Sequence, residues 1–553
     1  MHLLLYEGNE VCIHGTLNDS LNAINNQEFL VVYKSRIPEL QKIIIDMRSA
    51  LEKSWDNDVE SFVVLDLPDI VKLEFNKIKN SFNPYSKDSN CFNPKAKSYS
   101  PREYQKIAIE SLKKNDFCGL LSMATGTGKT LTSLFAVKEY EKMYGKSTVC
   151  VVVPQITLIE QWENNIKKVF PDSQILICAY NKNNWYSKLQ IILITSAKHS
   201  TNVFLICTYE TLTNPYFLSK VNKIKKNFIY VFDECHSLGS NKLREFFRPS
   251  KSAKTIGLSA TPERWFDDYG TTFVKTTVGP VVYEYTMEEA IKNNKLCEYE
   301  YYIVLSPLND SEMINYKSLS KKISKQAQID KGSEESFSKQ METLTMERAR
   351  ISKQCESKWA LFFDLFKNYK NKKGCLVYVY DKQVEDMVST IKKRFDLVCY
   401  GIVADTTAED RKKILNGFNE GTIDVLVAIK CLDEGVDIPN CHTEFILASS
   451  TNPREFIQRR GRVLRKTTKI PNKIATIYDF VTTAPVSNYY SNDDKISVIS
   501  RELPRVAEFV RLSDNKDDLG LIKYLSSIDG LANYQVQNPW GVCTNNNLND
   551  EGD

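Results

Sequence analysis

Residues 117–137 predict a strand, a glycine-rich loop and a helix in direct succession, and this unit constrains the fold more than any other feature. An apolar run precedes the loop Met123–Thr130, and a helical pattern begins at Leu131. In such a unit the glycines let the backbone close around phosphates, while the helix N-terminus offers free N–H groups. The loop therefore predicts a nucleoside triphosphate site, although Met123 stands where the general pattern has its first glycine.

The residues of this loop have separate expected tasks. Lys129 is expected to reach the β- and γ-phosphates, and the Thr130 hydroxyl to hold Mg²⁺. The backbone that surrounds the phosphates is expected to come from Thr125, Gly126, Thr127 and Gly128.

Composition places the chain among globular proteins of several domains. Its 553 residues exceed what one core accommodates, and they favour about three or four domains. The net charge is +4, so a nucleic-acid contact has to come from a local groove rather than from a basic surface overall.

The cysteines and the N-terminus predict a cytoplasmic location. None of the 14 cysteines falls in a C-x-x-C pair, and many lie in apolar runs, which is typical of reduced thiols in a reducing compartment. The first residues lack a secretory signal, and no apolar run is long enough to span a bilayer, so no membrane partner is expected.

Strand-like and helix-like segments divide the chain into five expected regions. Residues 100–290 and 374–485 repeat an apolar run, a turn and an amphipathic helix, which predicts parallel sheets covered by helices. Residues 308–360 carry no strand signal and predict solvated helices. The expected boundaries are an N-terminal accessory α/β domain at 1–95, α/β domains at 96–295 and 361–487, a helical connector at 296–360 and a helical tail at 488–553.

Two acidic residues follow the strand-like run 228–232, at the strand end where α/β sheets bind ligands. Asp233 is placed to hold Mg²⁺ through water, and Glu234 to polarise an attacking water. Such a pair is also common in solvated turns, but this one follows a phosphate loop by about a hundred residues. We therefore interpret it as the second part of the nucleotide site.

With these two parts in place, residues 100–485 resemble the superfamily 2 helicases and translocases, in their DECH/DEAH-like branch. Residues 259–262 match motif III, which links the ATP state to strand movement in that family. The resemblance implies an α/β fold with two RecA-like parallel-sheet domains in tandem, flanked by the N-terminal domain and the helical tail. ATP and Mg²⁺ are the implied cofactors.

The resemblance also assigns further nucleotide contacts. Arg102 and Gln105 match the adenine-reading element, with Gln105 as the expected base contact. Gly435 and Asp437 lie in a stretch that looks like motif V, and both are expected near the nucleotide.

Motif VI is matched by residues 458–465 on the second α/β domain. Gln458 is expected near the γ-phosphate, while Arg462 and Arg465 are expected to act as arginine fingers. Because the loop and carboxylates lie on one domain and the arginines on the other, the site is expected to become complete when the domains close, a state that ATP binding favours.

Two more motifs imply a nucleic-acid partner. Residues 154–162 match motif Ia and residues 208–212 match motif Ib, which hold a nucleic-acid backbone in this family. The expected contact residues are Pro154, Gln155, Gln161 and Thr208. DNA is favoured over RNA because motifs V and VI resemble those of restriction, repair and remodelling motors. Nuclease or methylase subunits are further partners that such systems imply.

The expected function is an ATP-dependent helicase or translocase, acting on duplex DNA in processing, repair or defence. A double-stranded RNA translocase is the alternative, since the DECH form also occurs in RNA-sensing relatives. A non-hydrolysing nucleic-acid-binding subunit is the alternative of another class, against which the intact catalytic residues argue.

Several residues keep two interpretations. His236 either links the ATP site to motif III or packs at the strand end. Tyr378 and Tyr380 either approach the strand groove or pack in the core. Lys430 stands where many relatives have a small or hydroxyl residue in motif V, which leaves that backbone contact open.

Overall fold

The computed structural model divides into two compact units, Met1–Ser98 and Tyr99–Asp553. The structure describes residues 2–6, 9–14, 31–34, 100–179, 182–196, 201–224, 226–250, 252–264, 267–330, 339–429, 438–467, 469–487 and 489–515.

In the N-terminal unit the described residues form an antiparallel sheet. Its strands are β1 (His2–Tyr6), β2 (Asn9–His14) and β3 (Val31–Lys34), in that order across the sheet. The helix expected at residues 37–55, which the prediction of an α/β domain needs, lies outside the described residues.

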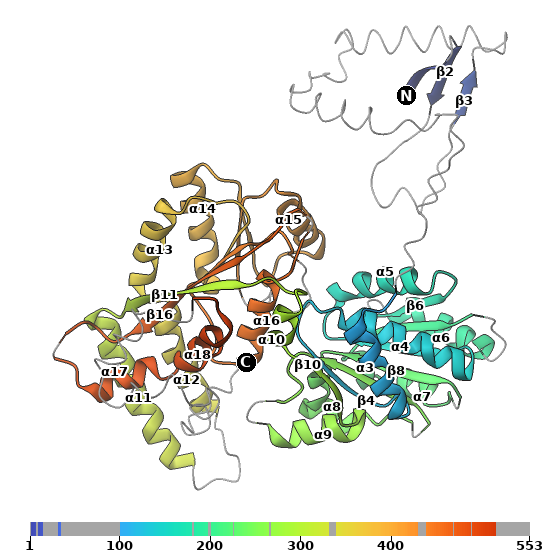
Figure 1. Ribbon diagram of the computed structural model, residues 1–553, viewed down its shortest axis with the longest axis horizontal. Coiled ribbons are helices and arrows are strands. Elements are labelled where there is room, and N and C mark those ends of the chain that lie inside the picture. Colours follow the sequence, from blue (N-terminus) through green and yellow to red (C-terminus); the bar gives the residue numbers. More distant parts are fainter. Residues whose placement is uncertain are drawn as a thin grey trace. The chain divides into compact units, whose positions relative to one another are not determined.

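The larger unit begins with a sheet that is flanked by helices such as α4, α6 and α9 (Figure 1). Its seven strands are all parallel, in the order β10-β4-β9-β8-β5-β7-β6. The strands are β4 (Gly119–Met123), β5 (Thr148–Val153), β6 (Gln174–Cys178), β7 (Val203–Thr208), β8 (Phe228–Asp233), β9 (Lys254–Ser259) and β10 (Val281–Tyr285). The helices are α3 (Glu103–Lys114), α4 (Lys129–Tyr144), α5 (Ile159–Val169), α6 (Lys182–Ser196), α7 (Pro215–Val221), α8 (Asn241–Phe246), α9 (Asp268–Val278) and α10 (Met287–Lys292).

Both faces of this sheet are covered, as parallel sheets require. Along β5 every residue is buried, and alternate side chains enter different apolar clusters: Val149 and Val151 belong to one, Cys150 and Val152 to the other. Because side chains alternate across a strand, a continuous apolar run marks burial on both faces. The polar carboxyl ends of the strands are then left at one edge of the sheet.

A second sheet has six parallel strands in the order β11-β16-β15-β12-β14-β13. The strands are β11 (Tyr299–Pro307), β12 (Cys375–Tyr378), β13 (Cys399–Ile402), β14 (Val425–Ala428), β15 (Thr443–Ile446) and β16 (Ala475–Thr483). The helices are α11 (Asp310–Asp330), α12 (Lys339–Lys353), α13 (Glu356–Asn368), α14 (Val384–Phe395), α15 (Ala408–Glu420), α16 (Pro453–Val463), α17 (Asn492–Ile499) and α18 (Leu503–Leu512).

The tandem of two parallel-sheet α/β domains confirms the predicted fold class, but one expected boundary is wrong. The predicted connector 296–360 contains β11, which pairs with β16 along its whole length and belongs to the second sheet. Residues 299–305 are strand-like in composition, but their partner β16 lies at the far end of the second domain, so no local pattern shows which sheet they join. The helices expected at 308–360 are present as α11 and α12.

The tail is helical where the structure describes it, and it is anchored to the second sheet. Arg505 of α18 makes two hydrogen bonds to the Asp479 carboxylate of β16, at 2.7 and 2.9 Å, and both residues are buried. The Tyr301 hydroxyl of β11 donates to the same carboxylate at 2.7 Å. Since buried charges are stable only when paired and hydrogen-bonded, this cluster fixes α18 against β11 and β16.

Candidate nucleotide site

On the first domain, the phosphate loop, the two carboxylates and the residues expected to contact nucleic acid follow the carboxyl ends of the parallel strands. The neighbouring strands β4, β9 and β8 end at the phosphate loop, at Ser259 and at Asp233. Next to β8, strand β5 ends just before Pro154 and strand β7 ends at Thr208, and the pairing of Val153 with Thr208 sets these ends side by side. Ligands of open parallel sheets bind beyond the carboxyl ends of the strands, and because β8 neighbours β5 the residues expected at the nucleotide lie next to those expected at the nucleic acid.

The phosphate loop joins β4 directly to α4. Gly126 and Gly128 have φ angles of 86° and 85°, in the left-handed region that favours glycine. The Thr127 hydroxyl donates to the Ala124 carbonyl at 2.7 Å, and the Tyr104 hydroxyl donates to the Thr127 carbonyl at 2.6 Å. These bonds hold the carbonyls away from the loop interior, which leaves N–H groups to face an anion at the N-terminus of α4.

Gln105 lies behind this loop and holds it in place. Its amide nitrogen donates to the Thr132 hydroxyl at 3.0 Å and to the Gly128 carbonyl at 3.4 Å. Its amide oxygen accepts from the backbone N–H of Arg102 at 2.9 Å. Both amide hydrogens are therefore used inside the protein, so the predicted base contact falls to the second lone pair of the oxygen.

Asp233 is held rigidly at the end of β8. The Trp162 indole donates to its carboxylate at 2.8 Å, and the Tyr209 hydroxyl donates to its carbonyl at 2.8 Å. Burial and the adjacent Glu234 carboxylate raise the pKa of Asp233 to about 6. A cation at this carboxylate offsets that cost.

Mg²⁺ suits this set of donors. It prefers oxygen ligands and is usually held by one or two carboxylates, a hydroxyl, water and substrate phosphates. Asp233 and Thr130 supply such oxygens, and the described residues contain no cluster of three His, Cys, Asp or Glu side chains that would favour another metal. The residues therefore fit the predicted magnesium site.

Glu234 connects the loop to the neighbouring strand end. Its φ of 45° is rare for a residue with a side chain, and such strain is typical of functional positions. One carboxylate oxygen lies 3.4 Å from the Lys129 ammonium, and the other accepts from the Ser259 hydroxyl at 3.5 Å. Both Lys129 and Glu234 are largely buried, so the carboxylate is oriented toward the phosphate loop.

His236 contacts the same network. Its Nδ1 lies 3.2 Å from the Ser259 hydroxyl, which also accepts from the Thr261 backbone N–H at 3.1 Å. Burial lowers the pKa of His236 well below its usual range, with Arg454 and Arg264 acting in the same direction. The imidazole is thus neutral and joins the carboxylate pair to motif III by hydrogen bonds, the geometry that the linking interpretation of His236 requires.

The motif VI helix α16 packs directly on the phosphate loop. A Cβ added at Gly461 would lie 2.8 Å from Cβ of Thr125, and one added at Gly126 would lie 3.2 Å from Cγ of Arg465. Gln458 and Arg462 are buried on this helix. The backbone of Arg465 forms a β-bridge with Leu296, whose side chain also lies beside Gly126. The structure therefore brings Arg465 to the loop, and its role as an arginine finger stays a prediction.

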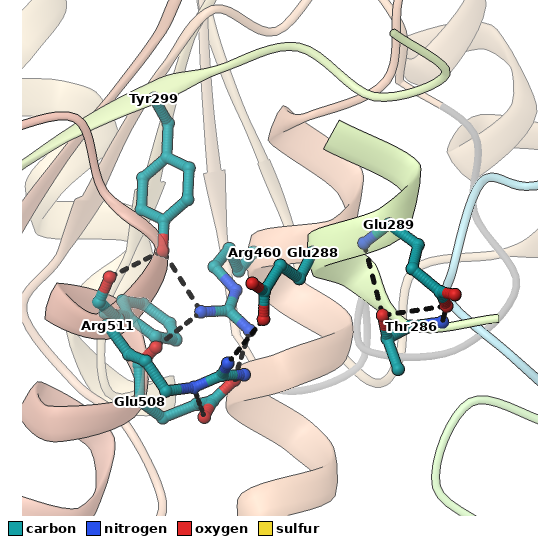
Figure 2. Close-up of polar contacts among 8 residues, drawn as sticks. Thr286, Glu288, Glu289, Tyr299, Arg460, Glu508 and Arg511 are labelled. Carbon is teal, nitrogen blue, oxygen red and sulfur yellow. Dashed lines mark hydrogen bonds and ion pairs between the residues drawn. The ribbon is translucent and has the colours of Figure 1, made fainter. Parts of the chain in front are cut away.

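Arg460, beside these residues, has a task that the sequence does not predict. It turns toward the tail helix α18, where its guanidinium donates to the Glu508 carboxylate at 2.6 Å and to the Tyr299 hydroxyl at 3.1 Å (Figure 2). On the same helix Arg511 pairs with Glu508 and, at 3.2 Å, with Glu288 of α10. The tail thus sets the position of the motif VI helix, through contacts that join segments too distant in sequence to leave a local signal.

We expect the buried pair to matter far more for stability than the exposed one. Glu508→Gln leaves the Arg460 cation buried without its carboxylate and should cost about 3–5 kcal/mol of unfolding free energy. Glu288→Gln removes only a solvent-exposed pair and should cost less than about 1 kcal/mol. Thermal unfolding of the two variants measures the difference, and equal midpoints would contradict a structural role for Glu508.

The four residues expected to contact nucleic acid occupy the surface beyond β5 and β7. Gln161 is exposed on α5, while Pro154, Gln155 and Thr208 are half-buried. Their roles stay predictions. The motif V residues Gly435 and Asp437, together with Lys430, lie outside the described residues. Tyr378 packs in the core beneath the Arg459 guanidinium, 4.6 Å from its ring centre, as the core interpretation states.

Comparisons with known families agree with this arrangement. The family described as "Type III restriction enzyme, res subunit" matches residues 98–264, and the "Helicase conserved C-terminal domain" matches residues 357–467. Within the described residues no helix is long and apolar enough to cross a membrane.

Individual proteins are similar over most of the chain. The DNA 3'-5' translocase XPB2 of Sulfurisphaera tokodaii is 27% identical over 66% of this chain and 79% of its own length. The DNA 3'-5' helicase XPB of Kineococcus radiotolerans is 21% identical over 66% of this chain and 57% of its own length.

A solved structure shares the fold. The ATP-dependent Type ISP restriction-modification enzyme LlaBIII bound to DNA aligns with a TM-score of 0.53 and 16% identity, over 79% of this chain and 31% of that one. The two matched families, the translocase relatives and the split arrangement of loop, carboxylates and arginines lead to one conclusion. The chain belongs to the superfamily 2 helicases, and it is an ATP-hydrolysing helicase or translocase.

Proposed function

We propose that this protein is an ATP-driven DNA translocase whose nucleotide site is formed by both sheets of the larger unit. The observation that carries the proposal is the packing of the motif VI helix on the phosphate loop, where Gly461 meets Thr125. This contact sets Arg465 beside the loop that is expected to hold the β- and γ-phosphates.

Each residue has a defined task in hydrolysis. Lys129 and the loop N–H groups would hold the phosphates, and Thr130 and Asp233 would hold Mg²⁺, which would supply positive charge against the phosphate oxygens. Glu234 accepts the proton of the attacking water. Arg462 and Arg465 stabilise the charge that develops on the transferred phosphoryl group.

The contacts of Glu234 provide a route from hydrolysis to movement. Its carboxylate meets Ser259 of motif III, and Asp233 beside it is bound by Trp162 of α5. Trp162 follows Gln161, one of the residues expected to hold the strand, so a change at the carboxylates reaches the nucleic-acid side within one residue. We expect the ATP state to alter the grip of α5 in this way.

Duplex DNA is the proposed track, on the strength of the translocase and restriction-enzyme relatives. The similarity to restriction proteins also supports nuclease or methylase subunits as partners. We expect polynucleotides to stimulate ATP hydrolysis, and duplex DNA to stimulate it more than single-stranded DNA, duplex RNA or single-stranded RNA of equal length.

This stimulation should fall steeply with salt, because backbone phosphates dominate such binding. A coupled-enzyme ATPase assay with the four polynucleotides between 50 mM and 200 mM salt, a range chosen to include roughly physiological ionic strength, measures both effects. Stimulation by RNA alone would overturn the choice of DNA.

A further inference from the structure

A cavity of about 250 Å³ lies on the second sheet's domain, apart from the residues assigned to the nucleotide. Its wall is formed by α12, by the loop that follows β15 and by Tyr380, which follows β12. It therefore opens at the carboxyl end of two neighbouring parallel strands, where such sheets bind ligands.

The lining of this cavity is strongly basic. One carboxylate, Glu502, is present, and it already forms an ion pair with Arg505 of α18. The basic side chains are Arg348, Arg350, Lys353, Lys358 and Arg501. An excess of cations around a small space attracts an anion, because their mutual repulsion destabilises the folded state and a bound anion offsets it.

Two of the basic residues serve as framework. The Lys358 ammonium donates to the Leu447 carbonyl at 2.8 Å, and Arg348 donates to the Ser320 hydroxyl of α11 at 3.3 Å. These bonds fix α13 and α11 around the cavity.

Arg350 and Lys353 differ from this framework pair. Within the part of the chain that the structure describes, neither forms an ion pair with a carboxylate. The Arg350 guanidinium lies 5.6 Å from the ring centre of Tyr380, and its buried Nε has no hydrogen-bond partner. A buried donor without a partner is costly and is met in a binding site by the ligand. These two side chains are therefore placed to bind an anion.

The remaining groups indicate which anion. Ser449, Ser450 and Thr451 also line the cavity, and hydroxyl-bearing residues together with guanidinium and ammonium groups are usual partners of phosphate oxygens. Pockets for whole small-molecule ligands begin at roughly 300 Å³, so this space suits a phosphate group better than a complete nucleotide.

We infer that this cavity binds a backbone phosphate of the nucleic-acid strand, an inference that rests on the proposed function. The cavity is connected to the motif VI helix through Ser450. The Ser450 hydroxyl accepts a hydrogen bond from the backbone N–H of Asn452, the N-cap of α16, at 3.1 Å. The Ser449 hydroxyl accepts from Arg459 of that helix at 3.4 Å. A phosphate bound here contacts the segment that positions the arginines at the ATP site.

The test compares DNA binding by the full chain and by an Arg350→Gln/Lys353→Gln variant, using fluorescence anisotropy with a labelled duplex over a range of salt. Loss of one phosphate contact should weaken binding about tenfold at 0.1 M salt and reduce the slope of log affinity against log salt by about 1. Lys339→Gln, at the exposed start of the same helix and outside the cavity, is the matched control and should bind as the wild type does.

Other outcomes separate the explanations. A double variant that matches the control in affinity and slope overturns the site, provided that the wild type binds DNA. If wild-type DNA binding is intact but ATP hydrolysis is not stimulated, the proposed motor function fails and the site stands. Binding of inorganic phosphate is measured by calorimetry. If the double variant no longer binds inorganic phosphate but keeps the wild-type affinity for DNA, the cavity binds free phosphate and not the strand. Lys353→Glu should weaken DNA binding more than Lys353→Gln, because it reverses the charge that faces the phosphate. Equal thermal midpoints of the two variants would show that this difference does not come from loss of folding.

Discussion

Replacing Glu234 with glutamine should leave ATP binding intact and slow hydrolysis by about 10²–10⁴-fold, the usual contribution of a general base. The carboxylate oxygen lies 3.4 Å from the Lys129 ammonium and faces the phosphate loop, so the substitution removes the proton acceptor while keeping the shape of the site. Single-turnover hydrolysis gives the rate, and a fluorescent ATP analogue gives the affinity.

Two variants frame this result. Lys129→Ala should lose both hydrolysis and most of the ATP affinity, because the cation that meets the β- and γ-phosphates is gone. Glu139→Gln lies on the same helix α4 but in a salt bridge with Lys142 at the surface, and it should behave as the wild type. Normal hydrolysis by Glu234→Gln would show that another group activates the water.

Arg465→Gln should reduce turnover by about 10³–10⁵-fold, the range for loss of an arginine finger, with little change in ATP affinity. The reason is that Arg465 belongs to the second sheet's domain, and the loop and Lys129 that bind the ground state remain complete. The split between kcat and KM is therefore the measurement.

Lys466→Gln is the matched control for this substitution. Lys466 is the next residue, is exposed and contacts Asn294, so its loss removes the same charge from the same segment. If both variants lose turnover equally, the effect comes from net charge near the site, and Arg465 is not an arginine finger.

Much of this site could be predicted from the sequence because its parts are local. The glycines of the phosphate loop and the carboxylates after β8 lie next to apolar runs, and parallel strands bring their carboxyl ends to one edge. Gly461 of motif VI meets Thr125 of the loop across more than three hundred residues, and motif order anticipated that the two belong together.

The rest depends on contacts with no local pattern. Trp162 donates a hydrogen bond to Asp233, and Arg460 donates one to Glu508. In both pairs the partners lie far apart in the sequence, and their residue types are common at ordinary core or surface positions. The hydrogen bonds by which Gln105 holds Gly128 and Thr132 leave no local signal either, and its contact with a base stays a prediction. The strand β11 has a strand-like composition, but its pairing with β16 joins the two ends of the second domain, and no local pattern encodes that contact.

Displacement of a third strand from a DNA triplex by the moving protein tests the central claim most directly. A translocase on duplex DNA should displace the labelled third strand in the presence of ATP and Mg²⁺. The Glu234→Gln variant should bind the same triplex but leave its third strand in place. Release without ATP, or no release by a wild-type protein that hydrolyses ATP on this duplex, would contradict movement along DNA.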